Sequence, residues 1–287
     1  MATRRKTVYD GFRFFSVLLL LMVSTLLQSV PARAAMLAQP LTSAQSQALI
    51  QRTLATEVRL AQDPAHPMRF LLHKSSPNLT TTKRIIETRD GAVARLISVF
   101  DRPLSPSDEQ KEEQRLNDLY NDPGRQNHRK HSEDADASIV LKLLRMLPSA
   151  FLYEDAGPGS RPGIERFRFR PNPNFNPPDL ESQSLNALNG ELWIDTTQER
   201  VTHLEGHLQR DTSYGWGVLG RLDKGGWVIL EQAEVAPHQW RIVRLQLKMN
   251  LRILWKNKIF DTTEEMSSYA PVQPGMDYRQ AIRILRQ

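Results

Sequence analysis

A run of alternating residues from Trp240 to Lys256 constrains this chain more than any other stretch, and it reads WRIVRLQLKMNLRILWK. From Val243 to Trp255 apolar side chains occupy every second position, and charged or amide side chains lie between them, with Leu254 as the one exception. A period of two places one set on each face of an extended strand. Because parallel strands are usually buried on both faces, a strand with one wet face predicts an antiparallel sheet. A turn at Asn250, which would split the run into a hairpin, stays open.

The rest of the chain adds further strands that mostly neighbour one another in sequence, and only a few helices. Asp90-Gly91 is the strongest hairpin signal, because both residues accept the positive φ of a tight turn. Residues 278–285 fit either a short helix or a final strand. This order predicts an α+β fold with an antiparallel sheet of some nine to eleven strands. The expected strands are 68–74, 81–89, 92–102, 151–153, 164–170, 191–195, 199–209, 226–235 and 240–256, and the expected helices are 42–61, 105–121 and 135–146.

Residues 1–34 have the pattern of a secretory signal peptide. Basic residues precede an apolar run at 14–27, and a small-x-small cleavage motif ends at Ala34. The apolar run is shorter than the roughly 18 residues expected of a membrane-spanning helix. The chain has no cysteine, which excludes disulfides and a lipid anchor on an amino-terminal cysteine. We therefore expect cleavage after about Ala34 and a periplasmic location, because small secreted eukaryotic domains usually use disulfides.

Most of the net charge of +6 belongs to this leader. The leader holds five basic residues and one acidic residue, which leaves 33 of the 38 basic and 31 of the 32 acidic residues in 35–287. A nearly balanced charge removes the main support for a nucleic-acid partner. Residues 35–287 are enough for one large β-rich domain or two small ones stabilised by their own core, and we expect a single domain.

Residues 105–134 interrupt this domain with a charged segment. Ser105-Pro106 is a helix start, and the helix that follows should be exposed, because it carries few apolar residues. Asp122-Pro123-Gly124 then predicts a break and a solvated loop that contains His128 and His131. We expect a charged helical insertion at about 105–134.

Two motifs are candidates for a metal-binding or a dinucleotide-binding site. His203, Glu205 and His207 alternate along one strand, so their side chains share one face and form a set that zinc or iron accepts. A polar, solvated strand face produces the same pattern, and this is the favoured interpretation. Residues 215–220 match a dinucleotide-binding G-x-G-x-x-G, but further glycines follow where the helix must begin. That segment is predicted to be a glycine-rich loop.

A row of arginines alternates with phenylalanines in the predicted strand 164–170. Arg166, Arg168 and Arg170 share one face of that strand. Three guanidinium groups in a row fit an anionic head group. The same charges also protect an edge strand from aggregation, and this second interpretation is favoured.

The stretch Gly190–Asp195, GELWID, with the following Arg200-Val201 and Leu204-Glu205-Gly206, resembles the periplasmic lipoprotein carriers, the LolA, LppX and RseB-like proteins. The likeness covers roughly residues 190–269 and is supported by Lys224-Gly225-Gly226, Trp240 and Ser267-Ser268-Tyr269. This resemblance implies a large curved antiparallel sheet, an open half-barrel, with about three helices covering its concave side. It also implies a protein that carries or senses lipid or acyl chains. No position matches the arginine in the cavity of those carriers.

The sequence thus predicts a periplasmic, non-enzymatic carrier or sensor of an apolar ligand, without a cofactor and monomeric. Its partners would be a lipid or an acylated protein, with transient membrane contact and no nucleic acid. The candidate ligand-binding residues form an apolar strip, although the residues of such a strip more often belong to an ordinary hydrophobic core. The strip consists of Leu192, Ile194, Leu245, Leu247, Met249, Leu251, Ile253 and Trp255. Two alternatives remain: a metal-dependent hydrolase that uses His203, Glu205 and His207, and an envelope interaction module without a small ligand.

Overall fold

The computed structural model describes residues 41–63, 65–179, 181–214, 220–253 and 256–287, so the predicted signal peptide lies outside the described residues. The described helices are α1 Ser43–Leu60, α2 Pro106–Asn121, α3 Pro123–Ala150, the 3-10 helix η2 Glu181–Ala187, and α4 Tyr278–Leu285. The described strands are β1 Met68–Ser76, β2 Leu79–Ile86, β3 Val93–Val99, β4 Arg102–Pro103, β5 Phe151–Pro158, β6 Ile164–Pro171, β7 Leu188–Asp195, β8 Arg200–Leu208, β9 Thr212–Tyr214, β10 Gly220–Leu222, β11 Trp227–Ala236, β12 Gln239–Ile253 and β13 Lys256–Pro271.

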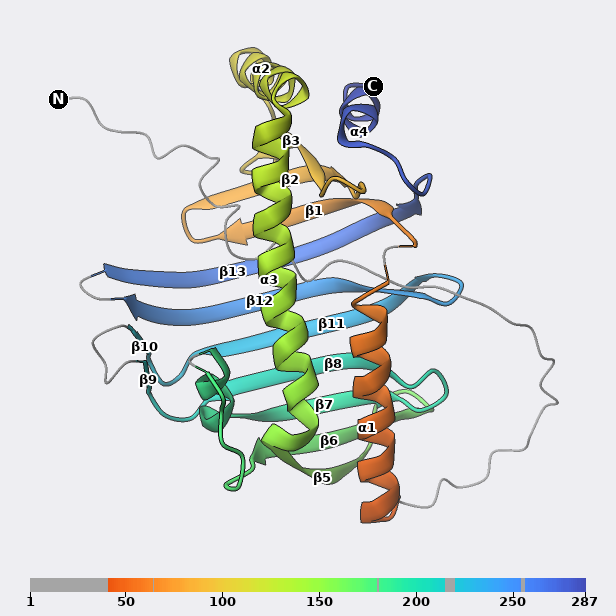
Figure 1. Cartoon of the computed structure of the whole chain (residues 1–287), viewed down its shortest axis with the longest axis vertical. Coiled ribbons are helices and arrows are strands. Elements are labelled where there is room, and N and C mark those ends of the chain that lie inside the picture. The colour runs from red at the N-terminus through yellow and green to blue at the C-terminus, as the bar shows by residue number, and fades with distance from the viewer. Residues whose placement is uncertain (1–40, 64, 180, 215–219, 254–255) are drawn as a thin grey trace.

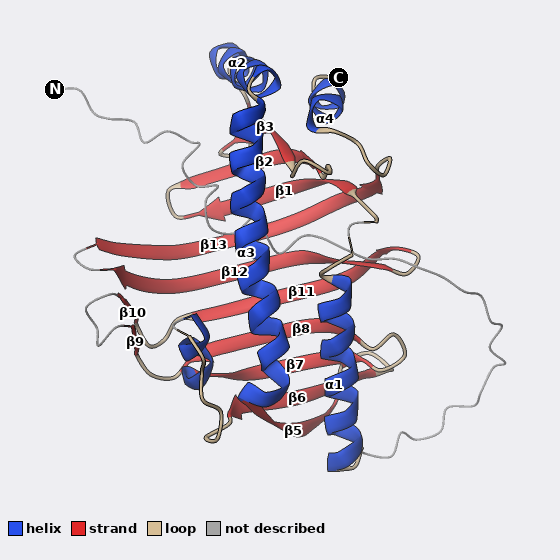
Figure 2. Cartoon of the chain, in the orientation of Figure 1, coloured by secondary structure: helices blue, strands red, loops and turns tan. Residues whose placement is uncertain are grey.

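All these strands belong to one antiparallel, thirteen-stranded sheet, in the order β4-β3-β2-β1-β13-β12-β11-β8-β7-β6-β5, with β10 and β9 following from β12 (Figure 1). The sheet is not closed, because β4 and β5 are its two ends. The helices α1 and α3 cross the same face of this sheet, and α2 and α4 lie beside its β3 end (Figure 2). The predicted fold class, α+β with an open antiparallel sheet and a few helices, is confirmed.

The long central strand β12 covers most of the alternating run 240–256. It continues through Asn250 without a turn and pairs with β13 as far as Ile253 and Lys256. The strand β13 was not predicted, because KNKIFDTTEEMSSYAP lacks apolar alternation. The strands β12 and β1 flank β13 and pair with its backbone on both sides. The extended conformation of β13 therefore depends on this backbone pairing more than on the pattern of its side chains.

The strand β6, which carries the arginine row, is not an edge strand. It pairs with β5 on one side and with β7 on the other. The explanation that these arginines protect a sheet edge is therefore wrong. Arg170 instead contacts Glu154 on β5, with 3.2 Å between its Nε and a carboxylate oxygen, and Arg166 donates to the carbonyl of Ala156.

The helix α3 is longer than predicted, because residues 123–134 belong to it and not to a solvated loop. The Asp122 side chain accepts a hydrogen bond from the amide of Arg125, at 3.0 Å, and Pro123 follows in the first turn. A proline fits that position, because the first residues of a helix have no intrahelical amide partner. Asp-Pro-Gly thus begins a helix here, where the sequence had indicated a break.

The insertion predicted at 105–134 is helical, but α2 is not simply exposed. Leu116 and Leu119 on α2 are fully buried in a cluster with Ile86 and Val93 of the sheet and with α4. Residues 278–285 form the short helix α4, whose Ile282 is also buried in this cluster. The segment therefore completes a second hydrophobic core at the β3 end.

Candidate functional site

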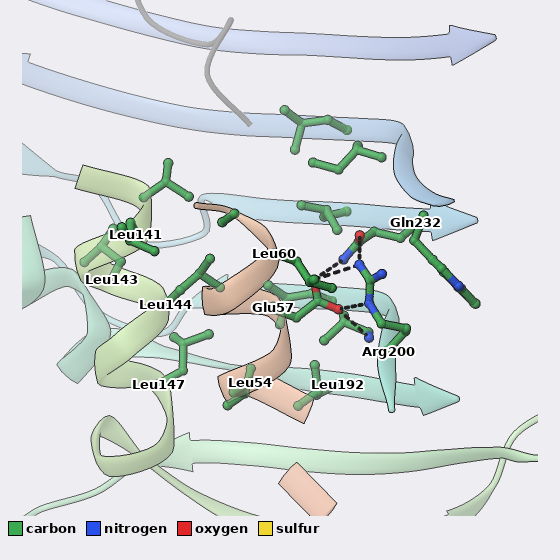
Figure 3. A pocket seen from close by; sticks show the side chains of 18 of the residues that line it. Leu54, Glu57, Leu60, Leu141, Leu143, Leu144, Leu147, Leu192, Arg200 and Gln232 are labelled. Carbon is green, nitrogen blue, oxygen red and sulfur yellow. Dashed lines mark hydrogen bonds and ion pairs between the residues drawn. The ribbon is translucent and has the colours of Figure 1, made fainter. Parts of the chain in front are cut away.

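A cavity of about 340 Å³ lies between the helices α1 and α3 and the face of the sheet that they cross. Its sheet side is formed by β7, β8, β11 and β12, and its lining is mostly leucine and valine (Figure 3). Ligand pockets that bury small molecules typically begin at about 300 Å³ and are lined mainly by apolar side chains. This cavity has the size and the lining of a site for a small apolar ligand.

The apolar residues of α3 form one wall of the cavity, and they are only partly buried. An amphipathic helix usually buries its apolar stripe against a core. Between residues 127 and 149, however, no residue of α3 is buried. Leu143 and Leu147 pack partly against the main core cluster, and Leu144 and the other lining residues of this helix face the cavity. The lining residues from α3 are Ala137, Val140, Leu141, Leu143, Leu144 and Leu147.

The sheet side of the cavity is better packed. Leu192 is almost completely buried in the main core cluster, and Leu204 packs partly against it. On β11 and β12, Leu230 and Leu245 belong to a neighbouring cluster that includes Phe70. The sheet therefore offers a firm apolar surface opposite a loosely packed helix.

One end of the cavity is polar and is built around Glu57 on α1. Its carboxylate accepts hydrogen bonds from Nε and Nη2 of Arg200, at 2.9 and 3.1 Å, and from the amide of Val201, at 3.0 Å. Gln232 on β11 accepts from Arg200 and donates to the same carboxylate (Figure 3). Both charged side chains are buried, with exposed fractions of 10% for Glu57 and 6% for Arg200. This network fixes α1 to β8.

Two further lining residues, Trp240 and Arg241, lie at the start of β12 and are also buried. The guanidinium of Arg200 lies over the Trp240 ring, 5.5 Å from its centre. Arg241 donates to the carbonyl of His66 at 2.7 Å and to that of Trp240 at 3.0 Å. Nearby, burial raises the pKa of Glu87 to about 7, although the charge of Arg241 acts in the opposite direction.

The residues His203, Glu205 and His207 lie on the other face of the sheet. They alternate with Leu204, which lines the cavity, so they point away from it. The ring of His207 contacts Glu205 at 2.6 Å, and this hydrogen bond lowers the pKa of the carboxyl. His203 packs against the ring of Trp193, with 4.5 Å between centres. Across the part of the chain that the structure describes, no group of three or more His, Cys, Asp or Glu is arranged to hold a metal ion.

A polar depression of about 510 Å³ covers part of that outer face. It brings two members of the arginine row, Arg168 and Arg170, beside Glu154, Glu191 and Glu205. The carboxylates offset the guanidinium charges, so this depression is not a simple anion site.

The predicted ligand-binding strip is only partly brought to the cavity. Leu192 and Leu245 line it, whereas Ile194 and Leu247 are buried outside the lining. Met249 and Leu251 are half-buried further along β12. The side chain of Ile253 and the whole of Trp255 lie outside the described residues, as does most of the glycine-rich segment 215–220.

The residues that sequence reasoning missed are the α3 wall and the polar end of the cavity. Val140, Leu143 and Leu144 lie in the predicted helix 135–146, but nothing in their spacing shows that they face a cavity. Glu57 lies on the buried face of α1, between Leu54 and Leu60, and its contact with Arg200, more than a hundred positions away, shows why a carboxylate is buried there.

Comparisons with protein-family models, with curated proteins and with solved structures found no match. Within the described ranges, no helix is both long enough and apolar enough to cross a membrane.

Proposed function

We propose that this protein is a periplasmic carrier or sensor of an apolar ligand, a lipid or an acyl chain, bound in the cavity between α1, α3 and the sheet. The observation that carries the proposal is the combination of a 340 Å³ apolar cavity with a helix, α3, whose lining leucines are only partly buried. A purely structural helix at this position would bury that stripe. The periplasmic location rests on the signal-peptide pattern in residues 1–34, and the relationship to LolA-like carriers stays a prediction.

The energetics of such a ligand are sufficient for transport or sensing. Burial of one methylene contributes roughly 0.8 kcal/mol, so a ten-carbon chain gains about 8 kcal/mol before the cost of association. A gain of about 8 kcal/mol alone corresponds to a dissociation constant of about 1 µM, and the cost of association weakens binding from that value, so dissociation constants between micromolar and millimolar are expected. That affinity permits both loading and release.

The two alternatives have less support. For a metal-dependent hydrolase, Nε2 of His203 and Nε2 of His207 both approach the Glu205 carboxylate, at 3.5 and 2.6 Å. These groups pair with one another, and the described residues hold no group arranged to bind a metal ion. In an interaction module that uses the charged insertion, Leu116 and Leu119 cannot contact the partner, because they are already buried in the protein's own core.

Binding of the uncharged fluorescent probe N-phenyl-1-naphthylamine tests the proposal. The wild-type protein should enhance the fluorescence of the probe in a saturable manner. Leu144→Arg places a charge in the cavity wall and should weaken binding at least tenfold, because a charge in an apolar cavity loses its hydration. Ile139→Arg is the matched control, since Ile139 lies on the same helix, is 39% exposed and is not part of the lining.

Circular dichroism should show that both variants keep the wild-type fold. Absence of saturable binding to the wild-type protein, or equal loss in both variants, would refute the proposed site.

A further inference from the structure

The polar end of the cavity contains two buried hydrogen-bond donors without acceptors. They are the indole Nε1–H of Trp240 and the Nε–H of Arg241, on adjacent residues that both line the cavity. Trp240 is 8% exposed and Arg241 is 3% exposed. Neither donor finds an acceptor among the described residues. Buried donors are usually satisfied within the chain. Other buried polar atoms of the described residues also lack a hydrogen-bond partner, among them Nε of Arg244, but Trp240 and Arg241 line the cavity, where a ligand can supply the acceptor.

The groups that line this end carry more positive than negative charge, although Glu87, just outside the lining, also acts on Arg241. Two guanidinium groups, those of Arg200 and Arg241, line the cavity with a single carboxylate, that of Glu57. The Glu57 carboxylate is taken by Arg200. The hydrogen bonds of Arg241 go to neutral backbone carbonyls. Its acidic neighbour Glu87 accepts from the amide of Met68 through Oε2, at 2.7 Å, while its Oε1 is buried without a hydrogen-bond partner.

We propose that Trp240 and Arg241 bind the anionic oxygen head group of an amphiphile, a carboxylate or a phosphate, whose alkyl chain extends among the leucines of the cavity. A guanidinium is suited to this role, because its N–H groups form short, charge-assisted hydrogen bonds with planar or tetrahedral oxyanions. This inference rests on the proposed function and names the chemical class of its ligand. The apolar surface supplies affinity for the chain, and the two donors select the head group.

A series of ten-carbon ligands tests the inference by displacement of N-phenyl-1-naphthylamine at pH 7.5. Decanoate and decyl phosphate carry an anionic head, 1-decanol is uncharged, and decyltrimethylammonium is cationic. The anionic ligands should bind at least about tenfold more tightly than 1-decanol, since hydrogen bonds to charged groups are stronger than neutral ones. The cationic ligand should bind most weakly. A difference between decanoate and decyl phosphate then identifies which of the two oxyanions the site prefers.

Variants separate the head-group contact from the chain. Arg241→Gln should remove most of the preference for anionic ligands and leave the affinity for 1-decanol within about twofold. Trp240→Phe, which removes only the indole donor, should reduce the preference by a smaller factor. Arg252→Gln is the control, because Arg252 lies on the same strand, its side chain is 48% exposed, it pairs with Asp223 at 3.2 Å, and it is not part of the lining.

The outcomes distinguish this inference from the proposed function. If the probe and 1-decanol bind but the anionic ligands show no advantage, the head-group inference is overturned and the carrier proposal stands. If the probe and all four ligands fail to bind, both are overturned. An advantage that survives Arg241→Gln and Trp240→Phe would also overturn the inference. Should Arg241→Gln not fold, the wild-type ligand series and Trp240→Phe still decide.

Discussion

Removal of the Glu57 side chain should destabilise this protein strongly, because it leaves a buried charge without its partner. Loss of one member of a buried ion pair typically costs about 3–5 kcal/mol. Total stabilities are only about 5–15 kcal/mol. With about 2–4 °C per kcal/mol for domains of this size, Glu57→Leu should lower the midpoint of thermal unfolding by roughly 6–20 °C. Glu57→Gln should cost less, since an amide oxygen still accepts from Arg200 and Val201.

A double-mutant cycle with Arg200→Met isolates the pairwise term. Replacement of both partners by apolar groups is often neutral, so the double variant should recover most of the stability that either single variant loses. The assay is urea unfolding followed by circular dichroism. The control is Glu199→Gln, which breaks the exposed contact between Arg52 and Glu199, at 2.8 Å, and should cost at most about 1 kcal/mol. If Glu57→Leu and Arg200→Met each lose no more stability than this control, the claim that Glu57 and Arg200 form a buried structural pair is refuted.

Three further predictions concern stability. The folded-state pKa of Glu87 is raised to about 7 from 4.5, so between these pH values the folded protein retains a proton that the unfolded chain releases. The free energy of unfolding should therefore fall by up to about 3 kcal/mol from pH 5 to pH 8. In urea titrations Glu87→Gln should flatten this pH dependence and the control Glu265→Gln should not, and an unchanged pH dependence in Glu87→Gln would contradict the assignment. Leu116→Ala should cost about 2–5 kcal/mol by urea unfolding, since Leu116 is fully buried, and a loss below 1 kcal/mol would mean that α2 does not pack on the core. Gly190→Ala should reduce the thermal midpoint clearly, because a Cβ there would lie 1.7 Å from the carbonyl oxygen of Glu205, whereas Gly124→Ala in the first turn of α3 should leave it unchanged or higher.

The sheet could be predicted because its pattern is local. The alternation along β12 fixes both its extended conformation and its buried face, and it needs no knowledge of the neighbouring strands. The strand β13 could not be found in this way, since its side chains do not alternate and its conformation depends on pairing with β12 and β1. The helical start at Pro123 was missed for a related reason: Asp-Pro-Gly favours a turn and a helix start equally, and tertiary packing decides between them.

The candidate site was less accessible to sequence reasoning than the fold. Leu192 and Leu245 were identified because an apolar strip on a sheet is a local feature. A cavity, however, is defined by what does not pack, and the distance between α3 and the sheet is set by the whole architecture. The polar end depends on pairing between Glu57 and Arg200, which only the folded chain brings together.

Native mass spectrometry of the protein purified without detergent from its own host is the most direct test of the central claim. The account predicts a population with a bound mass that is released on denaturation and identified as an amphiphile with an alkyl or acyl chain. The same mass should be absent from Leu144→Arg and present in Ile139→Arg. A wild-type protein that carries no ligand and takes up none from added decanoate or 1-decanol would contradict the account, and the cavity would then be an unoccupied packing defect.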